Sequence, residues 1–153
     1  MWRAASLRLL PVAELPLTGG CLCGAVRFEV TEPPVTASYC HCTRCQRRTG
    51  TAASVQVRIV PGSLQVTAGE ELLRAFKPED GFPKFFCSAC GAALWSSLPT
   101  TGEPVGVRFA AFDGDPGVRP AHRQYVAYAA AWEPIPDDGL PRYPERPPPQ
   151  GSR

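Results

Sequence analysis

The sequence predicts one mainly β domain, built from many short strands with almost no helix. Several segments alternate apolar and polar residues with a period of two, which is the pattern of a strand that buries one face. Turns that contain proline or glycine separate these segments. The chain has 153 residues, of which 44% are apolar, so it is long enough to bury a core within a single domain.

The alternating segments occur throughout the middle of the chain. We expect strands at residues 26–30, 54–59, 64–67, 72–76, 93–96 and 105–110. Pro33 and Pro34 end the first strand, and the turn at 61–63 predicts that 64–67 pairs with 54–59 as a hairpin. Residues 124–132 are ambiguous, because tyrosine and valine favour a strand while the alanines allow a helix.

The two ends of the chain differ from this central part. Residues 1–15 are expected to be an N-terminal extension, 16–133 the folded domain, and 134–153 a proline-rich tail that follows the surface or is disordered. Arg8, Pro11 and Glu14 interrupt the apolar residues of the extension, so we do not expect a signal peptide. No apolar run approaches the ~20 residues of a membrane span, so no membrane partner is expected.

Charge and cysteine content narrow the class of protein. The net charge of +2 is too small to predict nucleic-acid binding, although the excess of arginine over lysine favours anions weakly. Seven cysteines are too few for a disulfide scaffold of this length, and the number is odd. Closely spaced C-x-C pairs would also form strained disulfides. The sequence therefore predicts a reduced, cytoplasmic, metal-binding protein.

The central feature is the C-x-C-x-x-C segment formed by Cys40, Cys42 and Cys45. Residues 43–49 predict one or two helical turns that Gly50 ends, and the start of a helix favours thiolate. Three thiolates bind Zn²⁺ but leave one of its four positions open, as in reactive zinc sites. A remote fourth ligand would instead make the site structural, and the spacing alone leaves both alternatives open.

The other four cysteines share a different pattern. Cys21 and Cys23 precede Gly24-Ala25, and Cys87 and Cys90 precede Gly91-Ala92. Glycine in that place permits positive φ, which lets backbone N–H groups turn toward the sulfurs. Two such turns facing each other predict a closed Cys₄ zinc site. With the central cluster, this gives two Zn²⁺ per chain, and the closed site would tie together strands more than sixty residues apart.

Basic residues lie close to the open site. Arg44, Arg47 and Arg48 are candidates to offset the charge of the thiolates and to bind an anionic substrate, or they form a solvated face. His41 lies between two ligands and should point away from the metal, while His122 is a candidate remote fourth ligand. A thiol that entered the open position would be deprotonated and would remain nucleophilic toward a carbonyl such as an aldehyde.

Residues 20–28, 40–50 and 86–94, together with Ala131-Trp132-Glu133-Pro134 and the segment 138–143, resemble the glutathione-dependent formaldehyde-activating enzyme family. That family also contains proteins similar to centromere protein V. The resemblance covers about 17–145 and includes all seven cysteines. The N-terminal extension and the arginine-rich central loop depart from the family pattern.

The resemblance implies a zinc-bound fold of stacked short antiparallel sheets. It implies a structural zinc at Cys21, Cys23, Cys87 and Cys90, and a second, catalytic zinc at Cys40, Cys42 and Cys45. The implied reaction joins glutathione and formaldehyde into S-hydroxymethylglutathione, which is carbon–sulfur lyase chemistry.

Two classes of function follow. The first is a carbon–sulfur lyase-type enzyme that joins a thiol, glutathione above all, to formaldehyde or another small aldehyde. The second is a non-catalytic zinc module that carries glutathione or binds a protein or chromatin. Thiol–disulfide redox chemistry is a third alternative, which bound zinc would block. The sequence leaves the oligomeric state open.

Overall fold

The computed structural model describes residues 14–149, so most of the N-terminal extension and the last four residues lie outside it. This part of the chain is mainly β, as expected. Its strands are β1 (Leu17–Gly20), β2 (Arg27–Val30), β3 (Thr36–Cys40), β4 (Ser54–Arg58), β5 (Leu64–Ala68), β6 (Leu73–Phe76), β7 (Lys84–Cys87), β8 (Ala93–Ser97), β9 (Pro104–Arg108) and β10 (Pro120–Gln124). The α-helix is α1 (Thr43–Thr49), and 3₁₀ turns lie at η1 (Glu70–Leu72), η2 (Phe109–Ala111) and η3 (Val126–Tyr128).

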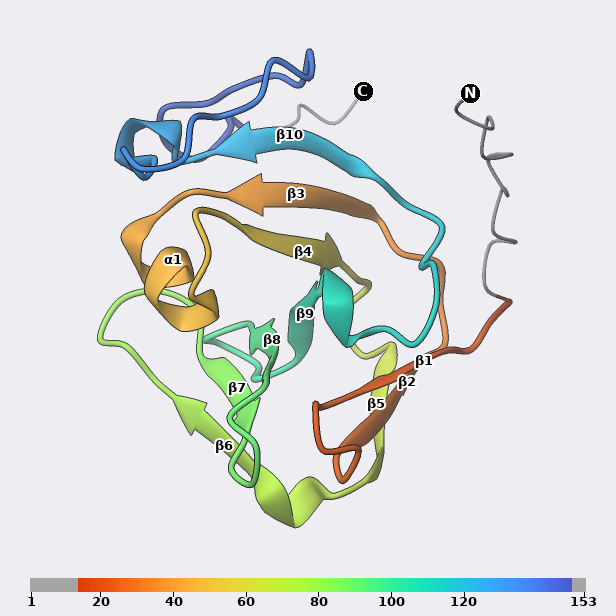
Figure 1. The fold of residues 1–153 in the computed structure, drawn as a ribbon. Coiled ribbons are helices and arrows are strands. Elements are labelled where there is room, and N and C mark those ends of the chain that lie inside the picture. The colour runs from red at the N-terminus through yellow and green to blue at the C-terminus, as the bar shows by residue number, and fades with distance from the viewer. Residues whose placement is uncertain (1–13, 150–153) are drawn as a thin grey trace, which may run out of the picture.

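The strands form two sheets (Figure 1). The larger has seven strands in the order β10-β3-β4-β9-β8-β7-β6, and the smaller has the order β1-β2-β5. Neighbouring strands are antiparallel except β10 and β3, which are parallel. The expectation of short antiparallel sheets therefore holds apart from this one edge pair.

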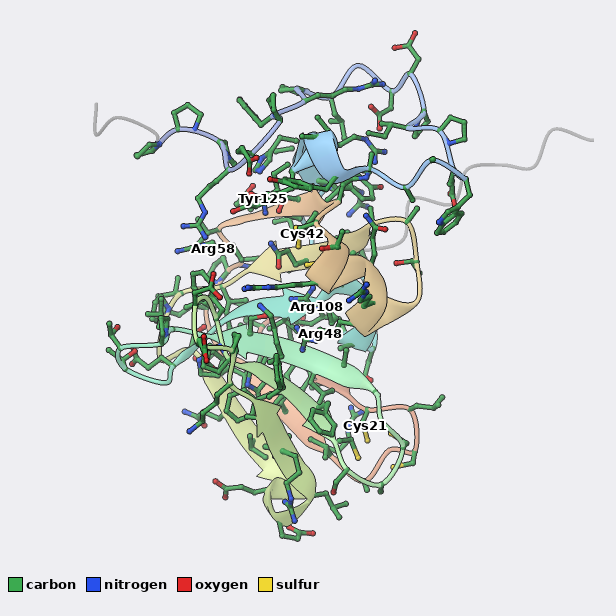
Figure 2. The ribbon with its side chains drawn as sticks, turned by 90° about the vertical axis from the view of Figure 1, so that its left-hand side faces the viewer. Cys21, Cys42, Arg48, Arg58, Arg108 and Tyr125 are labelled. Carbon is green, nitrogen blue, oxygen red and sulfur yellow. The ribbon has the colours of Figure 1, made fainter. Side chains whose placement is uncertain are left out.

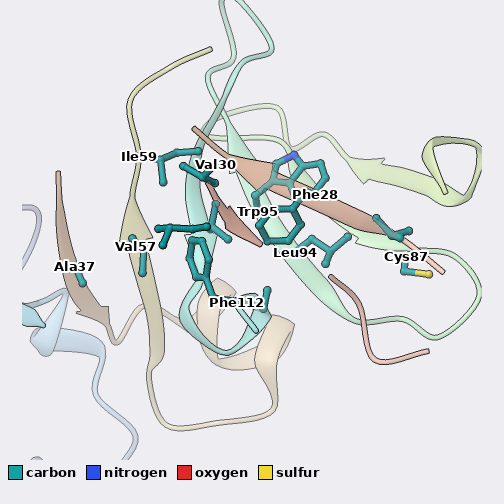
Figure 3. Packing of buried hydrophobic residues seen from close by; sticks show 13 residues of the cluster. Phe28, Val30, Ala37, Val57, Ile59, Cys87, Leu94, Trp95 and Phe112 are labelled. Atoms are coloured by element: carbon teal, nitrogen blue, oxygen red, sulfur yellow. The ribbon is translucent and has the colours of Figure 1, made fainter. Parts of the chain in front are cut away.

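The core lies between the two sheets (Figure 3). Phe28 of β2 is fully buried, and its ring meets those of Trp95 and Phe112 edge-on, with centroids 5.8 Å apart in both pairs. Val57 and Val107, paired across β4 and β9, complete this layer from the larger sheet. Burial of each such side chain away from water stabilises the folded state by about 1.5–3 kcal/mol.

The opposite face of the larger sheet is polar. On β3, Thr36, Ser38 and Cys40 alternate with the residues of the other face, and on β4 the same positions are Ser54, Gln56 and Arg58. Successive side chains of a strand point to opposite faces. The strands that build the core therefore also present polar groups on their far side.

Helix α1 forms where the sequence predicts it. The Sγ atom of Cys42 accepts a hydrogen bond from the backbone N–H of Cys45 at 3.4 Å and so caps the start of the helix. Gly50 ends it with φ of 68° and donates its N–H to Gln46 O at 2.8 Å. The short helix thus begins at one cysteine of the central cluster and contains another.

Two local predictions were wrong. Strand β5 pairs with β2 in the smaller sheet, with Leu64 opposite Val30, and not with β4. Both edges of β4 are taken by β3 and β9, so the turn at 61–63 carries the chain across to the other sheet. Residues 124–132 form neither one strand nor one helix, because β10 ends at Gln124 and a 3₁₀ turn follows.

The C-terminal segment 133–149 follows the surface beside β10. The N–H groups of Arg123 and Tyr143 donate to Pro141 O and Arg123 O, each at 2.9 Å. Asp138 in this segment pairs with Arg123 at 2.7 Å. Within residues 14–149, none of the helices has the length and apolar character needed to cross a membrane.

Candidate metal centres and the cleft beside them

Four cysteines from two turns meet at one end of the molecule. Cys21 and Cys23 follow β1, whereas Cys87 ends β7 and Cys90 lies in the turn after it. Their four sulfur atoms all lie within 4.8 Å of one another. Cys23 Sγ is 3.5 Å from Cys21 Sγ and 4.0 Å from Cys87 Sγ. These separations are close to the ~3.8 Å expected between thiolates arranged tetrahedrally around zinc.

The glycines after these pairs have the predicted conformation. Gly24 and Gly91 have φ of 78° and 74°. The backbone N–H of Val26 donates to Cys21 Sγ at 3.2 Å. A hydrogen bond from the backbone N–H of Ala92 lowers the pKa of Cys90 to about 6, which favours the thiolate that a metal requires. This cluster joins the smaller sheet to the larger one.

The other three cysteines form the second cluster. Cys40 ends β3, Cys42 caps α1 and Cys45 lies in its first turn, and their sulfurs also lie within 4.8 Å of one another. Figure 2 shows Cys42 beside α1, far from Cys21 of the first cluster. All seven cysteines are free thiols. The two clusters can each hold a metal ion, the first with four protein ligands and the second with three.

The second cluster is built to carry negative charge. Hydrogen bonds from the thiols of Cys40 and Cys42 lower the pKa of Cys45, and Ser54 and the charge of Arg108 act in the same direction. The same coupling, with burial, raises the pKa of Cys40. The charge of a thiolate in this cluster is therefore favoured at Cys45, beside Ser54 and Arg108.

A cleft of about 1120 Å³ opens beside this second cluster. Cys40, Cys42 and Cys45 line it, and its floor is the polar face of the larger sheet, from Gln124 on β10 to Lys84 on β7. Among the described residues that line it, Asp80 is the only acidic one, and Arg44 neutralises it at 2.7 Å. The remaining cations of the lining are Arg58, Lys84 and Arg146. The cleft is therefore positively charged and fits an anionic ligand.

The three arginines of the central loop have different positions. Arg44 lines the cleft, whereas Arg47 and Arg48 are not among its lining residues. Arg47 is exposed. Arg48 points inward and donates to Phe85 O and Trp95 O at 2.9 and 2.8 Å, so it ties α1 to β7 and β8.

The two histidines lie outside both sulfur clusters. His41 is buried, and its Nε2 lies 3.3 Å from Nη1 of Arg123. Burial and the charge of Arg123 lower its pKa, which keeps the imidazole neutral. His122 lines the cleft and packs edge-on against Tyr143. Burial lowers its pKa as well.

Sequence reasoning missed two residues of the site. Arg108 is 6% exposed and lies against the second cluster (Figure 2). Tyr125 lines the cleft and, within residues 14–149, is the one residue other than glycine with positive φ, at 57°. Such backbone strain is concentrated at functional sites. In the sequence, Arg108 is recognisable only as an arginine on the polar face of a predicted strand. Ordinary surface arginines occupy the same kind of position, so the sequence does not distinguish it as a buried residue of the site.

The fold and the two clusters define a small mainly β protein with one four-cysteine and one three-cysteine cluster. The model of the glutathione-dependent formaldehyde-activating enzyme family matches residues 16–128, and the chain belongs to this family. It is 33% identical over 105 residues to a Halomonas elongata protein named "Putative glutathione-dependent formaldehyde-activating enzyme", covering 65% of this chain and 67% of that one. A crystal structure of a Rhodobacter sphaeroides protein is similar with a TM-score of 0.54 and 26% identity, covering 83% of this chain and 99% of the other.

Proposed function

We propose that the protein is a zinc-dependent carbon–sulfur lyase-type enzyme that joins glutathione to formaldehyde, or to another small aldehyde, as an S-hydroxymethyl adduct. The observation that carries the proposal is the three-thiol cluster at the end of a positively charged cleft. Family membership supports the choice of thiol and aldehyde.

The donor sets favour zinc at both sites. Thiolates select zinc over the hard cations, and the sulfur separations fit its tetrahedral radius. Cys21, Cys23, Cys87 and Cys90 would hold a structural zinc. Cys40, Cys42 and Cys45 would hold the second, whose chemistry when bound is to keep an incoming sulfur as a nucleophilic thiolate. Free thiols of this kind persist in a reducing compartment such as the cytoplasm.

The protein side chains bind and orient the thiol. Arg58 lies four residues along β4 from Ser54, which pairs with Cys40, so about 13 Å of strand separates it from the cluster. The Arg58 side chain can reach back along part of this distance. The remaining gap between its guanidinium and the cluster suits a thiol whose carboxylates lie several ångströms from its sulfur. Arg58 and Arg146 supply the charges for these carboxylates. Gln56 and Gln124 also line the cleft and offer hydrogen bonds to the amide groups of glutathione.

The test has two readouts. Glutathione should perturb the visible spectrum of protein whose second site contains Co²⁺, because a new sulfur–metal bond forms. Exchange NMR with ¹³C-formaldehyde should show faster exchange between the free aldehyde and its glutathione adduct than the spontaneous rate, and Cys42→Ser should abolish the gain. An unchanged cobalt spectrum at millimolar glutathione would contradict the proposal and favour the non-catalytic zinc module.

A further inference from the structure

Three cations lie beside the second cluster. Arg108 donates to Ser54 Oγ at 3.0 Å and to Ser96 Oγ at 3.1 Å. Arg48 donates to the same Ser96 Oγ at 3.1 Å. Lys84 is the third, on β7 opposite Ser96. The side-chain partners of the two arginines are neutral oxygens, and among residues 14–149 none of the three cations forms an ion pair with a carboxylate.

This arrangement is costly without an anion. A buried charge that lacks a counter-ion loses its hydration and regains little of it from neutral oxygens. Arg108 is 6% exposed, and its Nε is buried with no hydrogen-bond partner. Burial lowers the pKa of Arg48 to about 9, so its guanidinium stays charged at neutral pH. Burial lowers the pKa of Arg108, and the negative charge of the thiolates of Cys45, Cys40 and Cys42 raises it.

We propose that Arg108, together with Arg48 and Lys84, makes the open position of the three-cysteine site select an anionic sulfur over a neutral ligand. The inference rests on the proposed function, since it concerns how that site chooses its fourth ligand. Arg108 acts here as a positioning residue, through its charge and not through contact with the aldehyde.

The charges explain the preference. Three thiolates around a divalent metal leave one net negative charge, and a fourth thiolate raises it to two. With a metal held by the three cysteines, an incoming thiol would lose its S–H proton to solvent, and its sulfur would keep the electron pair of that bond as the fourth thiolate. Three nearby positive charges favour this added negative charge. A neutral ligand adds no charge, so the same cations leave its affinity unchanged.

The experiment compares two probes on Co²⁺-loaded protein. The first is 2-mercaptoethanol, which carries no charge besides its sulfur once bound, and the second is imidazole, which binds as a neutral ligand. Arg108→Gln should weaken 2-mercaptoethanol at least about tenfold while imidazole affinity stays within about twofold. Arg108→Lys should restore most of the thiol affinity. Arg119→Gln, which removes an exposed charge paired with Asp115, is the matched control and should change neither.

Lys84→Gln provides a second variant in case Arg108→Gln does not fold, because Lys84 is less buried and lines the cleft. It should show the same selective loss, to a smaller degree. Equal loss of both probes, or unchanged affinity for the thiol in both variants, overturns the inference while the proposed function stands. If the wild-type cobalt site takes imidazole but no thiol, both the inference and the proposed function fail.

Discussion

Asp138 Oδ2 accepts two hydrogen bonds from Arg123, from Nη2 at 2.7 Å and from Nε at 3.1 Å. This pair fastens the C-terminal segment to β10. The guanidinium of Arg123 also covers the ring of Tyr39 at 4.0 Å, and its Nη1 faces His41, which lies between two cysteines of the second cluster. The C-terminal segment is thereby coupled to the loop that forms the open thiol site.

We expect Asp138→Asn to loosen this coupling. The amide keeps the size of the side chain but removes the charge that neutralises the buried Arg123. The melting temperature should fall by a few degrees, and the second metal site should bind Co²⁺ more weakly while the Cys₄ site keeps its affinity. Calorimetry and metal competition measure the two effects. Asp137→Asn, at an exposed neighbour, is the control, and an equal effect of both changes would refute the coupling.

The same pair predicts a pH dependence. The Arg123 guanidinium holds the pKa of Asp138 below its ordinary value of 3.8. The unfolded chain therefore binds this proton at higher pH than the folded one, so the stabilisation is complete well above pH 3.8 and is lost as the pH falls below it. The difference in unfolding free energy between wild type and Asp138→Asn should shrink from pH 7 toward pH 3. That difference is the readout because acid also removes metal from both proteins, and a constant difference would show that the carboxylate charge contributes nothing.

The two clusters should differ in their effect on folding. Cys87 is fully buried and joins the two sheets, so Cys87→Ser should cost more than about 4 kcal/mol of stability or prevent folding. Cys42 is only partly buried and caps a two-turn helix, so Cys42→Ser should stay folded and lose one zinc per chain. Elemental analysis with circular dichroism separates these outcomes. Two zincs in folded Cys42→Ser would remove this cysteine from the second site.

A close backbone contact yields another prediction. Gly69 has φ of 74°, and a Cβ there would lie 2.3 Å from the carbonyl oxygen of Ala25 in the first cysteine turn. Gly69→Ala should destabilise the fold by about 3 kcal/mol or more, since it combines strain with overlap. Gly102, with φ of 77° and open space around it, is the matched control, and its change to Ala should cost about 1 kcal/mol. Urea unfolding measures both, and equal costs would exclude the contact as the cause.

The features that depend on a few neighbouring residues could be predicted from the sequence. The helical turn that ends at Gly50 and the positive φ of Gly24 and Gly91 are examples, because each follows from local backbone geometry. The pairing of β5 with β2 could not, since a turn signal says that the chain reverses but not which edge is free. Arg108 and Arg58 occupy equivalent polar positions on neighbouring strands, yet one is buried and the other exposed. Only the complete sheet and the position of α1 decide between them.

The alternation along β3 and β4 has a consequence for how this protein can diversify. Residues such as Ser38 and Gln56 line the cleft and can be exchanged without disturbing the core, because Ala37 and Val57 beside them face the interior. The number of residues in each strand cannot be changed in the same way. Insertion of one residue would exchange the two faces, placing polar groups in the interior and apolar ones in the cleft. Redesign of the cleft should therefore use substitutions on these strands and confine insertions to the loops.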